Sequence, residues 1–209
     1  MVTEVLRLMN KGRLIVFSAP SGCGKGTMLA EILKDNSFRC SISSTTRQPR
    51  TGEIDGVSYF FISKEDFQNK ISNDEFLEYA EYCENFYGTL KSEVDEYLEK
   101  GINVILEIEV QGAMKVRELR PDALFVFIAP PSVKELRRRL NKRGTESQEV
   151  IEKRVAAAIT ELPYMDKYDY IIVNDALEDA ISDFFAVIRS EKLKTSAQAE
   201  FIEEVMKNA

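Results

Sequence analysis

The stretch that most constrains the fold of this chain is SAPSGCGKGT, residues Ser18–Thr27. An apolar run, Leu14–Phe17, precedes it and predicts a buried strand, while the MLAEIL that follows predicts a helix. Glycines in the turn permit backbone angles that aim successive N–H groups at one point, and a helix N-terminus adds partial positive charge there. The order of strand, glycine-rich turn and helix therefore predicts a phosphate-binding loop in an α/β protein.

The loop departs from the full motif G-x-x-x-x-G-K-[ST] at two positions. Ala19 replaces the first glycine, which a negative φ tolerates, and Gly26 replaces the residue whose hydroxyl usually contacts Mg²⁺. Thr27 stands one step later and can partly substitute, so the loop resembles the G-K-G-T ending of adenylate-kinase-type nucleoside monophosphate kinases. The alternative is a glycine-rich turn with a chance lysine. The residues expected to bind nucleotide phosphates are Ala19, Pro20, Ser21, Gly22, Cys23, Gly24, Lys25, Gly26 and Thr27.

Strands and helices alternate along much of the chain. Further buried parallel strands are expected where apolar runs lack strict alternation, and helices where apolar residues recur at helical spacing. This alternation predicts a doubly wound parallel sheet with right-handed crossovers. The expected strands are Leu14–Ser18, Ile102–Val110, Leu124–Ala129 and Tyr170–Val173, and the expected helices are Lys25–Lys34, Val133–Arg139 and Ala176–Leu193.

Two segments interrupt this alternation. In the first, residues 41–100, we expect a helix that starts at Ser63, has Asp66 as its capping partner and runs toward Phe76 and Leu77. A turn-like CENFYGT and a helix that stops at Gly101 follow. In the second, residues 136–167, a capping box of Ser132 and Glu135 leads into a basic stretch, and a helix from Gln148 to Glu161 ends before Pro163.

Composition excludes several classes of function. The net charge of −7 argues against a general nucleic-acid binder, and the absence of histidine removes His-based triads and the common zinc sites. No apolar run approaches the ~20 residues of a membrane span, and the N-terminus lacks a secretion signal. Three scattered cysteines, Cys23, Cys40 and Cys83, predict reduced thiols in a cytoplasmic protein. Cys23 lies at a helix N-terminus, which predicts a lowered thiol pKa.

The polar stretch SSTTRQPRTGEIDG holds two arginines three residues apart, Arg47 and Arg50, with Pro49 stiffening the chain between them. Paired guanidinium groups suit a dianionic phosphate, which they bind through charge-assisted hydrogen bonds. Tyr59 and Tyr87 can add hydroxyl donors to the same oxygens. The alternative for the arginines is a solvated surface loop.

The motifs SSTTRQPRTGE, FLEYA, NFYGT, GINVILEIEVQGA, RRRLNKRGTES and YDYIIVND occur in this order. With them the chain resembles the guanylate kinases of the bacterial type from about Arg13 to Arg189. The resemblance implies one domain: a P-loop doubly wound parallel sheet with an inserted mixed α+β subdomain that binds the nucleoside monophosphate, and a basic helical lid. The implied core spans about 13–40, 101–136 and 168–209, the insertion about 41–100 and the lid about 137–167.

The resemblance also implies which residues bind GMP. Arg47, Arg50, Tyr59 and Tyr87 hold its phosphate, and Ser43, Glu78 and Thr89 read guanine. Guanine offers N1–H and N2–H₂ as adjacent donors to one carboxylate, whereas adenine has no such pair. A buried Glu78 facing adenine would lose its partners, at a cost of roughly 2–5 kcal/mol. Without the motif, an exposed helix carboxylate would be the alternative for Glu78.

VILEIEVQG places Glu107 and Glu109 at alternate positions near the end of a predicted strand, so both should share one buried face. The resembled family usually has Asp-x-Asp here. The resemblance implies that Glu107 reaches the water shell of Mg²⁺ and that Glu109 reaches guanine, although both side chains are one carbon longer. The alternative is a salt-bridged structural pair.

A basic stretch of seven side chains stands out in this acidic protein, and the alternative to a role in binding is a solvated surface. By resemblance, three of them are lid arginines that close over ATP and stabilise the transferring phosphoryl group. These are Arg139, Arg143 and Arg154; Arg137 and Arg138 are expected at the surface, and Lys142 and Lys153 complete the stretch.

The resemblance implies a Mg²⁺-dependent enzyme that reversibly converts ATP and GMP into ADP and GDP, in guanine nucleotide synthesis and recycling, and the features of the sequence agree with it. The expected partners are ATP and GMP, with dGMP possible, but neither nucleic acid nor membrane; the chain is a monomer or a homo-oligomer. Two alternatives stay open. One is a related kinase with another acceptor, such as a ribose bisphosphate or a different monophosphate, and the other is a catalytically silent domain that binds protein ligands.

Overall fold

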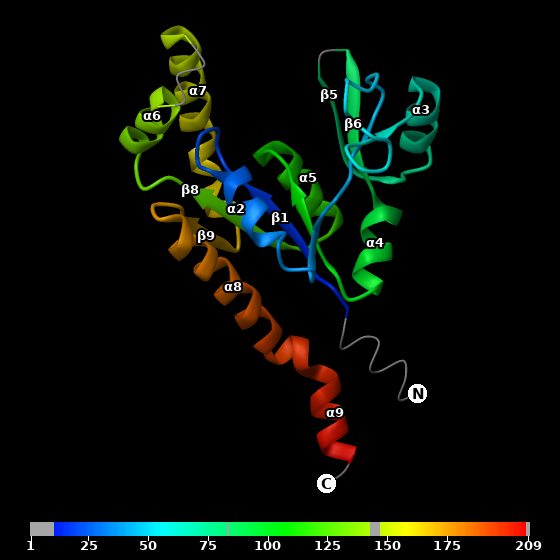
Figure 1. Ribbon diagram of the computed structural model, residues 1–209. Coiled ribbons are helices and arrows are strands. Elements are labelled where there is room, and N and C mark those ends of the chain that lie inside the picture. The colour runs from blue at the N-terminus through cyan, green and yellow to red at the C-terminus, as the bar shows by residue number, and fades with distance from the viewer. Residues whose placement is uncertain (1–10, 83, 143–146, 208–209) are drawn as a thin grey trace. The chain divides into compact units, whose positions relative to one another are not determined.

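The structure is a computed structural model that describes residues 11–82, 84–142 and 147–207 (Figure 1). The chain divides into two compact units. One is built mainly from Phe17–Asp35 and Phe125–Ala209, and the other from Gly12–Val16 and Asn36–Leu124. Among the described residues, no helix is both long and apolar enough to cross a bilayer.

The main sheet has five parallel strands in the order β2-β7-β1-β8-β9. Every residue of β1 and β8 is buried, as expected for strands covered on both faces. The predicted α/β fold is therefore confirmed, and β1, β8 and β9 have the predicted bounds. The strands are β1 Leu14–Ser18, β2 Phe38–Cys40, β7 Asn103–Glu107, β8 Leu124–Ala129 and β9 Tyr170–Val173.

The first unit carries the helices that follow β1, β8 and β9. α8 packs against α2 and β9, and the ring of Phe184 meets that of Phe17 edge to face at 5.8 Å. α6 and α7 lie side by side, and α9 continues beyond α8 (Figure 1). The helices are α2 Lys25–Ile32, α6 Val133–Lys142, α7 Gln148–Glu161, α8 Leu177–Leu193 and α9 Ala199–Lys207, with 3₁₀ turns at Leu162–Lys167 and Thr195–Gln198. α7 has the predicted bounds.

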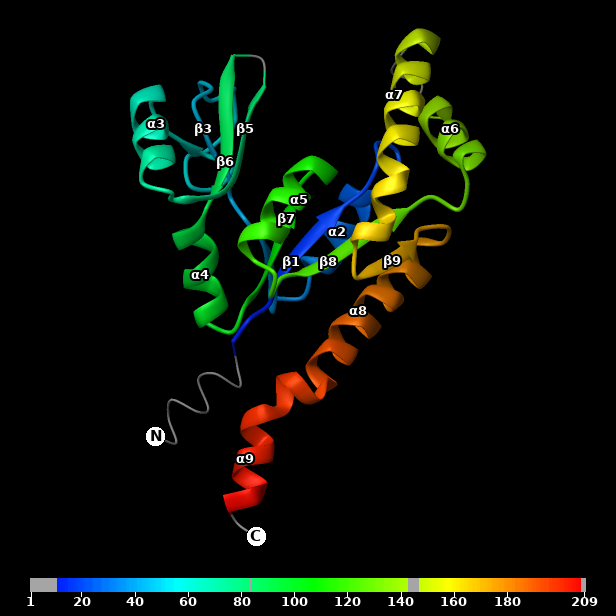
Figure 2. The same ribbon diagram turned by 180° about the vertical axis from the view of Figure 1, so that it is seen from behind.

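The second unit holds a separate mixed sheet of four strands in the order β4-β3-β6-β5. Figure 2 labels β3, β5 and β6 of this sheet. Phe67 of the neighbouring helix α3 stacks on Phe76 at 4.4 Å and on Phe86 at 5.4 Å, which gives this sheet a core of its own. The strands are β3 Ser44–Thr45, β4 Phe60–Phe61, β5 Phe76–Tyr82 and β6 Asn85–Leu90, and the helices are α3 Lys64–Ser72, α4 Lys91–Glu99 and α5 Val110–Leu119.

The start of α3 follows the prediction, but what comes after it does not. The Ser63 hydroxyl caps α3 by accepting a hydrogen bond from the Asp66 N–H at 3.0 Å. Phe76 and Leu77 lie in β5 and not in a helix, and NFYGT lies in β6 and not in a turn. Antiparallel pairing of β5 with β6 decides this region, and Cys83 lies outside the described residues.

The predicted strand 102–110 is also too long. β7 ends at Glu107, and Glu109 is the N-cap of α5, a helix that the sequence did not predict. α5 buries Val110, Ala113 and Val116, a spacing of three residues that fits one face of a helix. Of the residues that lengthened the predicted strand, Ile108 and Glu109 form the connection to this helix and Val110 is its first residue.

Candidate active site

The phosphate loop has the backbone that the motif requires. Gly22 and Gly24 have φ angles of 90° and 81°, which residues with a side chain rarely adopt. Gly24 is the N-cap of α2. Lys25 is the first residue of that helix. Among the non-glycine residues that the structure describes, positive φ angles occur at Asp74 and Glu84 alone, so Ala19 has the ordinary backbone that the sequence analysis required of it.

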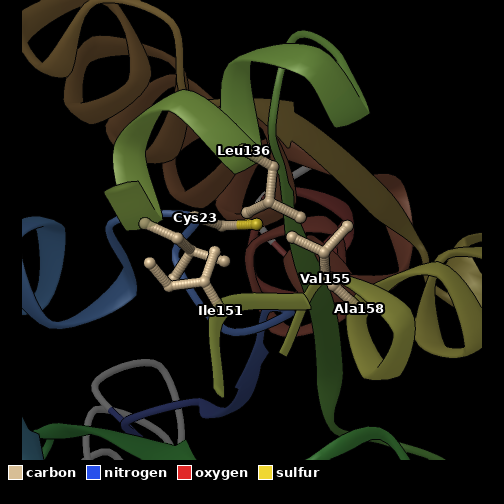
Figure 3. Close-up of a cluster of buried hydrophobic side chains, with 6 residues drawn as sticks. Cys23, Leu136, Ile151, Val155 and Ala158 are labelled. Carbon is tan, nitrogen blue, oxygen red and sulfur yellow. The ribbon is translucent and has the colours of Figure 1, made fainter. Parts of the chain in front are cut away.

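The thiol of Cys23 does not have the lowered pKa that its place at a helix N-terminus predicts. Its side chain is fully buried in an apolar cluster with residues of α6 and α7, where its sulfur lies among Leu136 and Val155 (Figure 3). This burial raises the pKa of the Cys23 thiol to about 12, so the predicted lowering is wrong. The thiol instead packs the loop against the two helices. The other members of the cluster are Leu140, Ile151 and Ala158.

Two of the three predicted lid arginines reach the loop or its surroundings. Arg154 of α7 donates to the Ser21 hydroxyl from Nε at 3.0 Å and from Nη2 at 2.6 Å. Arg139 of α6 donates to the carbonyl oxygens of Asn174 and Asp175 at 2.7 Å and 3.2 Å. These contacts place one guanidinium directly on the phosphate loop. Arg143 lies outside the described residues.

The capping box predicted for α6 forms only in part. The Ser132 hydroxyl accepts a hydrogen bond from the Glu135 N–H at 3.1 Å, but the Glu135 carboxylate bonds Arg138 and Arg139. These two arginines lower the pKa of Glu135 to about 2. Arg138 is exposed, as predicted, and so is Arg137, which pairs with Glu152 of α7.

Asn174, which sequence reasoning did not single out, supports the loop. Its buried side-chain amide donates to the Cys23 carbonyl at 2.7 Å, and its own carbonyl accepts the bond from Arg139. A Cβ at Gly24 would lie 2.5 Å from the Asn174 amide nitrogen, so only glycine fits there. The one signal available from the sequence was an asparagine directly after a predicted strand.

Four of the nine residues predicted to bind GMP, Ser43, Glu78, Tyr87 and Thr89, lie on one face of the small sheet. Thr45 pairs with Tyr87, and Thr89 pairs with Glu78, so these four side chains share that face. Ser43 stands two residues before Thr45, and alternation places it there too. The Tyr59 ring lies 6.0 Å from the Tyr87 ring. The sheet register thus brings together residues that are up to 46 positions apart (from Ser43 to Thr89).

Glu78 is held in an environment that suits recognition of a base. Its carboxylate accepts a hydrogen bond from the Thr89 hydroxyl at 2.9 Å. Burial raises the pKa of Glu78, while Thr89 and the charge of Lys115 oppose that shift. A Cβ at Gly112 of α5 would lie 3.8 Å from the carboxylate, so α5 passes close to it. Glu78 is therefore a strand residue facing inward, and not the exposed helix carboxylate of the alternative interpretation.

The predicted phosphate ligands Arg47 and Arg50 lie in the loop after β3. Arg47 forms a two-pronged ion pair with Glu53, with distances of 2.9 Å and 2.8 Å. Its guanidinium carbon lies 5.4 Å from the centre of the Tyr59 ring. Arg50 is exposed. Arg47 and the two tyrosines therefore gather at one end of the face that carries Glu78.

The two strand carboxylates do not have the predicted geometry. Glu107 and Glu109 are both exposed, so the expectation of two buried acids is wrong. Glu107 ends β7, whereas Glu109 belongs to the turn that starts α5, so strand alternation does not relate them. No group of three or more His, Cys, Asp or Glu side chains able to hold a metal exists within the described ranges.

The open space at Gly26 leads to a prediction. A Cβ there meets nothing within 4 Å, so Gly26→Ser should fold normally and gain about 0.5 kcal/mol from helix propensity. It should leave the KM for Mg-ATP unchanged or lower, because it restores the usual loop hydroxyl. Gly24→Ser is the matched control and should lose both stability and ATP affinity. Tm and KM measurements on both variants test this, and a Gly26→Ser variant as damaged as the control would contradict it.

A parallel sheet whose first strand runs into a glycine-rich Gly-Lys loop at a helix N-terminus, with arginines on the following helices, defines a P-loop nucleotide kinase. The family model for guanylate kinase matches residues 11–191. The chain belongs to the guanylate kinase family.

Individual relatives agree with this assignment. A guanylate kinase of Clostridium tetani is 51% identical over 186 residues, covering 89% of each chain. That of Carboxydothermus hydrogenoformans is 52% identical over 187 residues, covering 89% of this chain and 92% of the relative. The crystal structure of guanylate kinase from Anaplasma phagocytophilum matches with a TM-score of 0.66 at 35% identity, covering 88% of each chain.

Proposed function

We propose that this protein transfers a phosphoryl group from ATP to GMP, giving ADP and GDP. The observation that carries the proposal is the face of the small sheet where Glu78 and Thr89 lie beside Tyr59 and Tyr87. One end of that face offers an acceptor for base donors, and the other offers cations and hydroxyls for a phosphate. A purine monophosphate whose base offers two adjacent N–H donors, as guanine does with N1–H and N2–H₂, matches both ends.

On the donor side, the glycine backbone and the N-terminus of α2 bind the phosphates of ATP, and Lys25 adds a full charge. Arg154 is held on the loop by Ser21, and we propose that it contacts the same phosphates. In this proposal Arg139, Arg143 and Arg154 stabilise the negative charge on the transferring group. The reaction then needs no histidine base, because positioning and cations supply the catalysis.

On the acceptor side, Arg47, Arg50, Tyr59 and Tyr87 hold the phosphate of GMP. Ser43, Glu78 and Thr89 read guanine, and the Glu78 carboxylate accepts both N1–H and N2–H of the base. Glu109 is proposed to contribute from the start of α5. Adenine and pyrimidines lack this pair of donors and leave the carboxylate without partners, which disfavours them.

Mg²⁺ is proposed as the cofactor, and it neutralises phosphate charge when bound. It commonly keeps several waters and binds through one or two carboxylates together with substrate phosphates. The exposed Glu107 at the end of β7 suits such a contact through water, and a cage of protein ligands is not required. The division into core, insertion and lid, the use of dGMP and a cytoplasmic location stay predictions.

The test is ADP formation from Mg-ATP with GMP, AMP, CMP and UMP offered separately. We expect strong turnover with GMP alone. Turnover with none of the four would instead favour a sugar-phosphate kinase or a silent binding domain, and equal turnover with AMP would remove Glu78 from base recognition. A ribose bisphosphate offered in the same assay separates the first of these alternatives from the second.

A further inference from the structure

The loop between β3 and β4 contains a carboxylate that the proposed reaction does not use. Glu53 accepts hydrogen bonds from Arg47 Nη1 at 2.9 Å and from Arg47 Nη2 at 2.8 Å. It also accepts one from the backbone N–H of Arg50 at 2.7 Å. One carboxylate thus contacts both of the arginines that are proposed to receive the phosphate of GMP.

The hydrogen bonds of Arg47 with Glu53 and Gln48 use only one part of its guanidinium group. Glu53 fills the fork between Nη1 and Nη2, and Nη1 also donates to the Gln48 carbonyl at 2.7 Å. An arginine has five N–H donors, and these bonds use three of them. The other two, the Nε–H and the second Nη2–H, lie along one edge of the guanidinium. After Glu53, a side-chain hydrogen bond with Tyr87 also raises the pKa of Arg47, and Tyr87 is itself proposed to hold the phosphate. The guanidinium is therefore held at one edge while the other can meet an anion.

The loop backbone is fixed by the same carboxylate. The Glu53 N–H donates to the Arg50 carbonyl at 3.0 Å, while the Glu53 side chain accepts from the Arg50 N–H, so residues 50–53 form a closed turn. Gly52 has a φ of 89° inside this turn, which suits glycine. The Arg47 and Glu53 side chains are only 15% and 21% exposed, so this ion pair is better sheltered than an ordinary surface pair.

The pKa shifts of both groups are consistent with a stable ion pair between Arg47 and Glu53. The hydrogen bond from Arg47, followed by that from the Arg50 backbone, lowers the pKa of Glu53, so this carboxylate is ionised at neutral pH. The bond with Glu53 correspondingly raises the pKa of Arg47. The negative Glu53 carboxylate reduces the net positive charge of a site that is proposed to bind a dianion. Glu53 therefore does not help by attracting the phosphate, and its contribution is to orient the two arginines.

We propose that Glu53 is a positioning residue of the acceptor site: it fixes the Arg47 guanidinium and the Arg50 backbone in the conformation that receives the phosphate of GMP. This inference rests on the proposed function of Arg47 and Arg50. It predicts that loss of the carboxylate weakens GMP binding although the site becomes more positive. A simple electrostatic view predicts the opposite sign.

The experiment measures binding of GMP and of guanosine to the whole protein by calorimetry, and the KM for GMP and for ATP. In Glu53→Gln we expect the Kd and KM for GMP to rise about tenfold, equivalent to about 1.4 kcal/mol. The affinity for guanosine, which has no phosphate, and the KM for ATP should stay within about twofold. Glu53→Asp, which keeps the charge on a shorter side chain, should recover part of the loss.

Glu75→Gln is the matched control, because Glu75 is also a carboxylate of the second unit, and it pairs with Lys70 at 2.9 Å. It should leave every one of these constants unchanged. Tighter or unchanged GMP binding in Glu53→Gln would overturn the inference, and so would an equal loss of guanosine affinity, which would indicate a general structural role. If the wild type fails to phosphorylate GMP, the proposed function falls, while the comparison of GMP with guanosine still decides the role of Glu53.

Discussion

Lys25→Met should lower kcat for GMP phosphorylation by about a thousandfold while leaving the fold intact. Lys25 follows the left-handed Gly24 and opens α2, where the loop N–H groups and the helix N-terminus converge. Its ammonium is the one full charge that the loop itself carries. Methionine has a similar length and favours helices, so α2 should form as before while the charge on the transferring phosphoryl group loses its partner.

The measurement is kcat with saturating GMP and Mg-ATP, together with Tm and far-ultraviolet circular dichroism. Lys34→Met is the matched control: Lys34 lies just past the end of α2, is 69% exposed and pairs with Glu31. It should retain the wild-type rate. Near-normal turnover in Lys25→Met would contradict the proposed mechanism, whereas a large fall in Tm would show that the lost rate reflects unfolding.

The parts of the fold that could be predicted from the sequence are those where burial imposes a pattern on the residues themselves. β1 and β8 are continuous apolar runs because both faces are covered, and both have the predicted bounds. α7 has a serine N-cap and a proline just past its end, and these signals define its bounds. In each case the information is local in the sequence.

The hairpin of β5 and β6 could not be predicted, because its structure depends on partners distant in the sequence. FLEYAEY fits a helix or a strand, and what selects the strand is pairing with β6 and stacking on Phe67. The pairing also explains the glycine at position 88, because a Cβ there would lie 2.8 Å from the Glu78 carbonyl oxygen. The short β2 has three residues and no alternation to reveal it.

The candidate site shows the same division. The motifs, and the family resemblance built on them, led to the predicted roles of the arginines and Glu78, because phosphate and guanine recognition demand particular residue types. They did not single out Glu53 or Asn174, whose printed hydrogen bonds are to other protein groups. The burial of Cys23 was missed for a related reason, since it depends on α6 and α7, more than 100 residues further along the chain. Residues that support the site through contacts with other protein groups can be recognised only in the folded structure.

Glu78→Gln should raise the KM for GMP by at least about thirtyfold, equivalent to ~2 kcal/mol, with little effect on the KM for ATP. The glutamine oxygen can still accept the bond from Thr89, but its NH₂ group faces one of the two N–H donors of guanine. In the wild type, the KM for GMP should also rise as the pH falls toward the raised pKa of Glu78, because the protonated carboxyl no longer accepts both donors. Steady-state kinetics with each substrate varied in turn, repeated across this pH range, measure both effects.

The same substitution should not destabilise the free protein. Because burial raises the pKa of Glu78 in the folded state, its contribution to stability is fully present below the unfolded pKa and is lost as the pH rises through the folded value. Gln carries no charge that burial would penalise. The Tm difference, Glu78→Gln minus wild type, should therefore be more positive at pH 7 than at pH 4. Glu81→Gln, an exposed position on the same strand, should change neither the KM for GMP nor this Tm difference. A variant that loses Tm at pH 7 and loses affinity for ATP as well as GMP would show that Glu78 serves the fold and not the choice of base.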